Sequence, residues 1–149
     1  MQSGRMIMRI SLFIPLGLCV AAGLAVPVQA QESYLADLTG AAEVPGPGDS
    51  DAAGIATIDW NTENEQLCYA LSIDDIDPAT AAHIHRGGAG EAGPPVVTLE
   101  TPGPGGGANG CMDIDDSLRA ELRDNPGGFY VNVHNDAYPA GAVRGQLER

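Results

Sequence analysis

The three histidines of this chain are the residues whose type and spacing point most directly to chemistry. His83 and His85 form a His-x-His pair, and His134 ends the alternating run Phe-Tyr-Val-Asn-Val-His at residues 129–134. In β-strands alternate side chains face opposite ways, so the pair would share one face, and His134 would point away from the core. Neutral imidazole is a common transition-metal ligand, so three converging imidazoles would form a metal site with one copper ion as the candidate cofactor.

Two further polar residues are expected near the histidines. Asn132 shares the face of His134 by the same alternation, and Arg144 would lie close if its strand pairs with that of His134 through the turn at 135–141. A competing interpretation needs no metal, because histidines are often half-buried and satisfied by hydrogen bonds to backbone or neighbouring side chains. A calcium site formed by one of two acidic runs is a further alternative, although neither run has the ligand spacing of an EF-hand loop. Those runs are Asp74, Asp75 and Asp77, and Asp113, Asp115 and Asp116.

Short alternating runs separated by Gly and Pro clusters supply the elements that would position these residues. The predicted strands lie near residues 34–38, 54–60, 66–73, 81–85, 95–100, 128–134 and 142–147. Residues 45–51 and 101–107 are predicted to be loops because Gly and Pro dominate them. Asp115 can cap one short helix that carries Leu118 and Leu122. The pattern predicts an all-β fold, either an antiparallel sandwich or a Greek-key barrel, with one short helix.

The N-terminal segment predicts export. Basic residues precede an apolar run at residues 10–26, and Val-Gln-Ala at 28–30 has the small-residue pattern of a cleavage site. We therefore expect a signal peptide over residues 1–30 and a single domain over 31–149, secreted or periplasmic and free of the membrane after cleavage. The alternative is an uncleaved membrane anchor, which Pro and Gly residues within a barely long enough run disfavour.

Composition narrows the classes of partner and the redox setting. The chain has 20 acidic residues against 7 lysines and arginines, a net charge of −13, so its surface should repel nucleic acid and anionic lipid. A chain of this length suits one modest core, and we expect a monomer.

Cys68 and Cys111 lie beyond the predicted leader. An even number of cysteines in an exported protein favours a disulfide over two free thiols.

No sequence motif supports covalent catalysis or phosphate binding. The chain has no Gly-x-Ser-x-Gly elbow and no free cysteine paired with a base. The glycines at 87–90 follow a predicted strand, but neither a predicted helix nor a lysine follows them. We therefore assign no catalytic residue and expect a role other than that of an enzyme.

Three segments taken together resemble the CHRD domain family, named for chordin, in its exported bacterial form. They are LTGAAEVP at 38–45, AHIHRG at 82–87, and YVNVH at 130–134 with PAGAVRGQL at 139–147. The resemblance covers residues 34–147, and Cys68 and Cys111 occupy positions similar to those of bacterial members. It implies an immunoglobulin-like β-sandwich. It also fits a binding or structural module outside the cytoplasm, whose partner would be an extracellular protein or glycan.

A weaker resemblance links the histidines to the copper/zinc superoxide dismutases. Those Greek-key β proteins bind copper through a His-x-His pair and a histidine from a later strand, with an arginine that guides the anion. His83, His85 and His134 could fill three of these positions, and Arg144 that of the arginine. The chain has no further histidine for a second metal. The resemblance thus implies at most a mononuclear copper site, for metal handling or superoxide dismutase-like chemistry.

Overall fold

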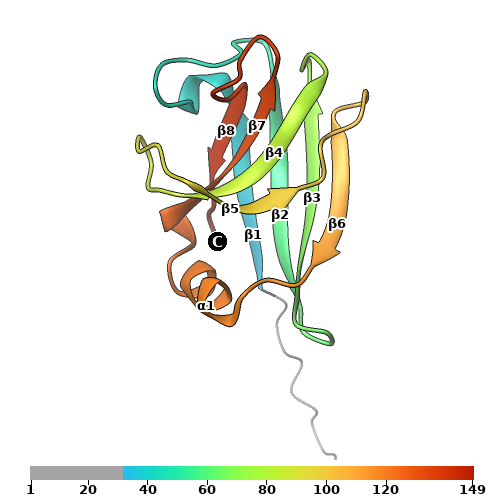
Figure 1. Ribbon diagram of the computed structural model, residues 1–149, viewed down its shortest axis with the longest axis vertical. Helices are drawn as coiled ribbons and strands as arrows, with labels where there is room; N and C mark the ends of the chain where they lie inside the picture. The colour runs from blue at the N-terminus through green and yellow to red at the C-terminus, as the bar shows by residue number, and fades with distance from the viewer. Residues whose placement is uncertain (1–31) are drawn as a thin grey trace, which may run out of the picture.

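One antiparallel β-sheet of eight strands forms the body of the protein in the computed structural model, which describes residues 32–149. The strands are β1 (Ser33–Thr39), β2 (Ala53–Asn61), β3 (Gln66–Asp74), β4 (Ala79–Arg86), β5 (Pro95–Leu99), β6 (Gly107–Met112), β7 (Phe129–Asn135) and β8 (Val143–Gln146). Their order across the sheet is β5-β4-β7-β8-β1-β2-β3-β6. The sheet curls almost closed around one core, with β5 and β6 as its two edges (Figure 1).

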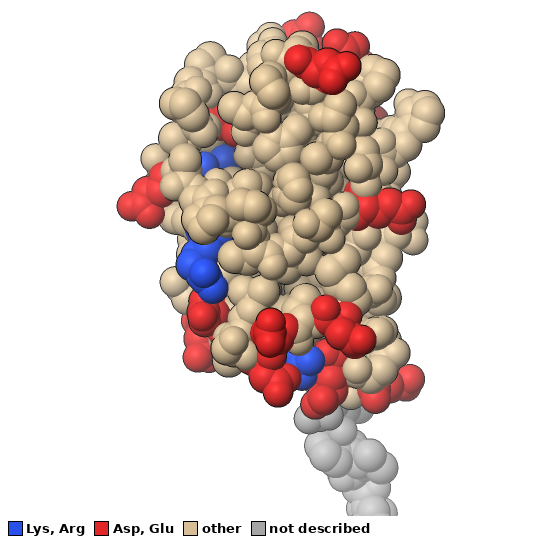
Figure 2. Space-filling view, viewed as in Figure 1, with Lys and Arg blue, Asp and Glu red and all other residues tan. Residues whose placement is uncertain are grey.

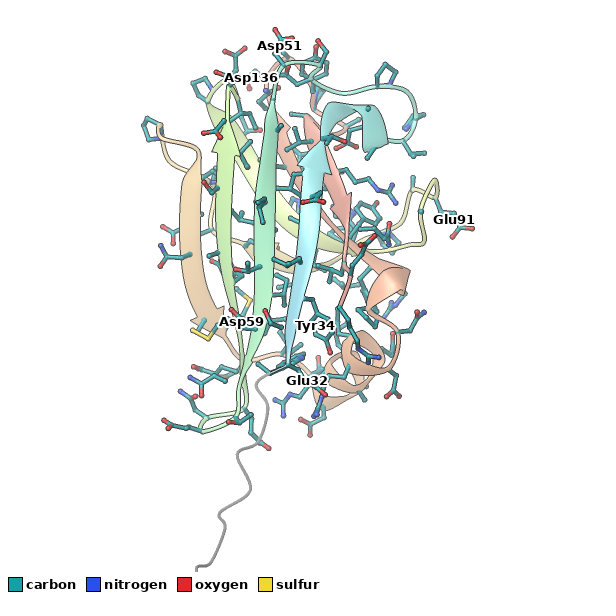
Figure 3. All side chains as sticks on the ribbon, turned by 180° about the vertical axis from the view of Figure 1, so that it is seen from behind. Glu32, Tyr34, Asp51, Asp59, Glu91 and Asp136 are labelled. Carbon is teal, nitrogen blue, oxygen red and sulfur yellow. A yellow bond between two sulfur atoms is a disulfide. The ribbon has the colours of Figure 1, made fainter. Side chains whose placement is uncertain are left out.

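The link between β8 and β1 is the narrowest part of the sheet. Only Thr39 and Arg144 pair there within the strands, and Leu35 bridges Glu148 just beyond. The sheet bends at this link, so β4, β5, β7 and β8 face β1, β2, β3 and β6 across the core (Figures 1 and 3). The all-β antiparallel prediction is confirmed, and the two layers belong to one hydrogen-bonded sheet.

Alternation along the strands builds the core as predicted. Every second residue is buried from Ala56 to Trp60 in β2 and from Leu67 to Ile73 in β3. In the middle of β4 and β7 the inward residues are buried as well. The fully buried residues of these four strands include Ala56, Ile58, Leu67, Ala82, Ile84, Val131 and Val133. Trp60 also lies in the core, on the same face of β2 as Ala56 and Ile58, with only 5% of its surface exposed.

Strand β6 is the one strand that the sequence pattern does not predict. Its residues GANGCM include weak strand formers and no alternating apolar stripe. The strand exists because β3 pairs with it, with Cys68 directly opposite Cys111. These two cysteines form a disulfide with a Cα–Cα distance of 4.0 Å, which confirms the predicted bridge. Tertiary pairing therefore overrides a poor local propensity here.

The predicted short helix is α1 (Asp116–Asp124), which lies at the lower end of the sheet (Figure 1). Asp115 occupies its N-cap position, but its side chain makes no capping hydrogen bond, so the predicted cap is present only by position. Leu122 is fully buried against the core. Two 3-10 turns, η1 (Gly40–Ala42) and η2 (Pro126–Gly128), complete the elements. Across residues 32–149, no helix is both long and apolar enough to span a bilayer. The predicted leader at residues 1–30 lies outside the described residues.

Charged side chains lie mainly at the ends and along the margins of the face seen in Figure 2. In the view of Figure 2, acidic groups cluster at the top and bottom, whereas the middle of this face, over β4 and β5, is largely uncharged. Asp51 and Asp136 mark the upper end in Figure 3, where the loop before β2 meets the turn between β7 and β8. The outer face of β4 and β5 is thus a weakly charged region of an acidic protein.

Candidate metal centre

Strands β4 and β7 lie side by side in the sheet and carry all three histidines. His83 pairs with Asn132 across the strands, and Ala81 pairs with His134. Residues 81 and 83 share one face of β4, so His83 lies diagonally across from His134 on that face, and His85 continues the row. The residues between them are buried in the core, which leaves the histidines on the outer face as the alternation predicts.

The three imidazoles converge. One nitrogen from each of His83, His85 and His134 can be chosen so that all three atoms lie within 4.8 Å of one another. The closest pair is His83 Nδ1 and His134 Nε2, which are 3.2 Å apart. Two nitrogens that bind one ion at about 2.0 Å with a tetrahedral angle are themselves about 3.3 Å apart. The spacing of this pair therefore suits a shared ion.

Backbone carbonyls fix the orientation of two of the rings. His85 Nδ1 lies 2.8 Å from the carbonyl oxygen of Gly93, and His134 Nδ1 lies 3.2 Å from that of Pro139. A carbonyl can only accept, so Nδ1 carries the proton in both rings and Nε2 holds the lone pair. His83 Nδ1 donates to His134 Nε2, whereas His85 Nε2 is buried and has no hydrogen-bond partner among residues 32–149. A metal ion would satisfy that orphaned lone pair.

The environment keeps all three histidines neutral near pH 7. Burial is the largest cause and lowers the pKa of His83, His85 and His134 below the usual value. A neighbouring imidazole lowers the pKa of His83 and His134 further, and the charge of Arg144 does so for His85. Neutral imidazole is the form that binds a metal.

Arg144 lies near the histidines but has its own partners. It is 2% exposed, and its guanidinium donates to the carbonyl oxygens of Glu91 and Gly88, both at 2.8 Å. It lies 3.5 Å above the ring of Tyr130, which in turn stacks on His85 with ring centroids 4.9 Å apart. Arg144 therefore ties the loop between β4 and β5 to the sheet and supports His85 through an aromatic ring.

Glu43 is a buried acidic group that the sequence analysis does not single out. It is 7% exposed, and Asn132 Nδ2 donates to its Oε2 over 3.3 Å. Burial raises the pKa of Glu43 to about 7. Added Cβ atoms at Gly141 and Gly48 would come within 2.4 Å of Glu43 Oε2 and 2.8 Å of its Cγ, so glycine at these positions makes room for the carboxyl group. Glu43 and Tyr130 both fall in the segments quoted for the CHRD resemblance, which is the one signal that could have identified them.

Replacing Glu43 by Gln is expected to stabilise the protein at pH 8 by roughly 1–3 kcal/mol. The pKa of Glu43 rises from 4.5 unfolded to about 7 folded, so the folded state binds more protons within that window. The free energy of unfolding therefore falls as the pH rises from 4.5 to about 7. Above that range the full cost of ionising the buried Glu43 carboxyl group is present. Glutamine stays neutral and still accepts from Asn132. Urea unfolding should show a larger difference in the free energy of unfolding between Glu43→Gln and the wild type at pH 8 than at pH 5.

The control for this experiment is Glu63→Gln, which changes an exposed carboxyl group in the turn between β2 and β3. This variant should match the wild type within about 0.5 kcal/mol at both pH values. A Glu43→Gln effect of equal size at pH 5 and pH 8 would contradict the assignment of an ionisation cost to Glu43.

Comparison with known proteins identifies the family but no characterised relative. The model of the CHRD domain matches residues 34–147, a range that contains the three histidines and both bridged cysteines. No curated protein and no solved structure matches the chain. The match covers almost all of the described residues.

Proposed function

The chain belongs to the CHRD domain family, and we propose that it is an extracytoplasmic module that binds one copper ion through His83, His85 and His134. The observation that carries the proposal is the convergence of three imidazole nitrogens within 4.8 Å. The orphaned Nε2 of His85 and the two carbonyl-fixed tautomers add to it. Such preset rings lower the cost of assembling a site when a metal arrives.

The donor set favours copper over other ions. Nitrogen ligands bind copper(II) more tightly than zinc(II) or the other divalent ions of the first transition row. Calcium and magnesium prefer oxygen, and no carboxylate joins the three histidines in the cluster of potential ligands among residues 32–149. Both cysteines of the domain are in the disulfide, so no thiolate competes. Bound copper would keep an open coordination position for water or a small ligand.

The surroundings of Arg144 favour metal handling over superoxide dismutase-like chemistry. An arginine that guides an anion to the metal needs free donors near the open position. Here two guanidinium nitrogens donate to the carbonyls of Glu91 and Gly88, and Tyr130 lies between Arg144 and His85. We therefore favour storage or delivery of copper as the role of the domain.

Two observations bear on location and partners. Disulfides persist in oxidising compartments, so the bridge between Cys68 and Cys111 supports export together with the predicted leader. A module that binds a protein through an apolar patch would expose several large hydrophobic side chains. Among the described residues only Leu35 and Ile55 do so, which makes a metal the better-supported ligand.

The test is titration of residues 31–149 with copper(II) and zinc(II) by calorimetry, with the disulfide intact. This segment retains the whole sheet and its core. We expect one copper(II) per chain with a sub-micromolar Kd, weaker zinc(II) binding at the same site, and nitrogen hyperfine splitting in the copper EPR spectrum. Absence of saturable copper binding, or an EPR spectrum without nitrogen ligands, would refute the proposal.

Gly93→Ala is expected to weaken copper binding by about 10- to 100-fold while all three histidines remain. A Cβ at Gly93 would lie 1.6 Å from the carbonyl oxygen of Arg86, so the loop must move. That movement would displace the carbonyl that holds His85 Nδ1. Calorimetry measures the effect, and Gly105→Ala, with open space around its Cβ, is the matched control. Unchanged copper affinity in a folded Gly93→Ala variant would show that this carbonyl does not position His85.

A further inference from the structure

A buried positive charge lies beside the proposed copper site. Arg144 is 2% exposed, and its guanidinium carbon lies 3.5 Å from the centre of the Tyr130 ring. That ring stacks on His85 with an angle of 14° between the two planes. Burial is the main reason why the pKa of His85 is lowered, and the charge of Arg144 lowers it further. A metal ion on His85 would take the place of that proton and experience the same repulsion.

No carboxylate pairs with Arg144 among the described residues. Its guanidinium donates to the backbone carbonyls of Glu91 and Gly88 and to the side-chain amide of Gln146, which are all neutral acceptors. None of the ion pairs in this part of the chain includes it. The pKa of Glu43 is lowered by the charge of Arg144, but burial dominates and raises it to about 7. At pH 6 Glu43 is therefore mostly protonated, and the charge of Arg144 stays uncompensated.

The ligands of the site are uncharged as well. His83, His85 and His134 offer three neutral imidazoles, and no carboxylate or thiolate among residues 32–149 joins them. The face over β4 and β5 is also largely uncharged (Figure 2). A bound copper ion would therefore keep its full charge in a half-buried position. Both the repulsion from a nearby cation and the cost of desolvation rise with the charge of the ion.

We propose that the site selects copper(I) over copper(II) and that Arg144 sets this preference through its charge. The preference rests on the copper site proposed above and specifies the oxidation state of the ion. The repulsion from Arg144 is twice as large for a doubly charged ion as for a singly charged one. Copper(II) also favours tetragonal coordination, for which three histidines supply too few ligands. The protein transfers no electron here, because it binds an ion that arrives reduced.

The affinities for the two ions test the preference directly. Residues 31–149 are titrated at pH 6 with copper(II) by calorimetry. Copper(I) is added under nitrogen as its acetonitrile complex, without a reducing agent that would open the disulfide, in competition with a chromogenic chelator. The reduction potential of the bound ion, measured by voltammetry, should exceed that of copper in excess imidazole, where neutral nitrogens have no neighbouring cation. A potential at or below that value would overturn the preference, whereas failure to bind either ion would refute the copper site itself.

Three arginine variants test the source of the preference. Arg144→Gln removes the charge and should lower the ratio of the copper(II) Kd to the copper(I) Kd by about tenfold, or 59 mV for one electron. Arg144→Lys keeps the charge and should stay within about threefold of the wild-type ratio. Arg123→Gln removes an exposed charge from α1 and should not change the ratio. A wild-type ratio in Arg144→Gln, or an equal fall in Arg144→Lys, would overturn the role of Arg144. If Arg144→Gln fails to fold, the comparison of the wild type with imidazole still decides whether copper(I) is preferred.

Discussion

Replacing any one of His83, His85 or His134 by alanine is expected to weaken copper(II) binding by at least about 100-fold. Each histidine supplies one of three converging nitrogens, and loss of one leaves two ligands that water must supplement. Loss of a ligand should therefore cost at least as much as the loss of a residue that only orients one. Calorimetry of each variant against the wild type measures the change in Kd.

The matched control is Asp136→Asn, because Asp136 is an exposed carboxylate two residues from His134. Copper held by the acidic surface rather than by imidazoles would respond to this change. We expect wild-type affinity in Asp136→Asn and loss of affinity in all three histidine variants. Retention of copper affinity in any one histidine variant would remove that residue from the site.

Thermal unfolding with and without copper is a second test of the prediction that the three histidines bind the ion. A ligand that binds only the folded state stabilises it by about 2.7 kcal/mol at a free concentration 100 times its Kd. Copper should therefore raise the Tm of the wild type and of Asp136→Asn, and leave that of His134→Ala almost unchanged. Without metal, His134→Ala should cost at most about 1.5 kcal/mol, since it removes the hydrogen bond with His83 and that with the carbonyl of Pro139 from a partly exposed position.

Removal of the disulfide has the second-largest expected effect, a loss of about 4 kcal/mol in the free energy of unfolding. The bridge joins residues 43 positions apart, and a chain loop of this length has considerable entropy to regain in the unfolded state. Cys111 is exposed and Cys68 is half-buried, so the double variant Cys68→Ser, Cys111→Ser leaves the core intact. Urea unfolding of this variant and of the wild type measures the difference.

Reduction of the wild type supplies the control. A reducing agent should lower wild-type stability to that of the double serine variant and have no effect on the variant itself. Hydrogen exchange should become fast first in β6, because this edge strand has weak local propensity and pairs only with β3. A loss below about 1 kcal/mol, with β6 still protected, would show that pairing with β3 suffices to hold the strand.

Much of the fold could be predicted from local pattern. Alternation identified seven of the strands, and the position of Asp115 before Leu118 and Leu122 identified α1. The same alternation put the three histidines on outward positions. The even number of cysteines in a chain expected to be exported predicted the disulfide between Cys68 and Cys111. These features depend on neighbours in the sequence or on the compartment, so they can be predicted without coordinates.

Strand β6 and the partners of Glu43 and Arg144 could not be predicted in this way. The glycines of β6 carry no strand signal, and only the register with β3 brings Gly110 opposite Tyr69 and Cys111 opposite Cys68. Burial of Glu43 depends on the close approach of Gly48 and Gly141, which come from two separate loops. Such contacts join segments far apart in the chain, and no local pattern encodes them.

The sequence by itself determined which residues could act as ligands and which face of a strand each would occupy. Only the tertiary structure decided that His134 lies within reach of His83 and His85, because that distance depends on the register of β7 against β4. A shift of one residue would turn His134 into the core and break the cluster. Side-chain alternation is a property of each strand, whereas register and curvature are properties of the folded sheet.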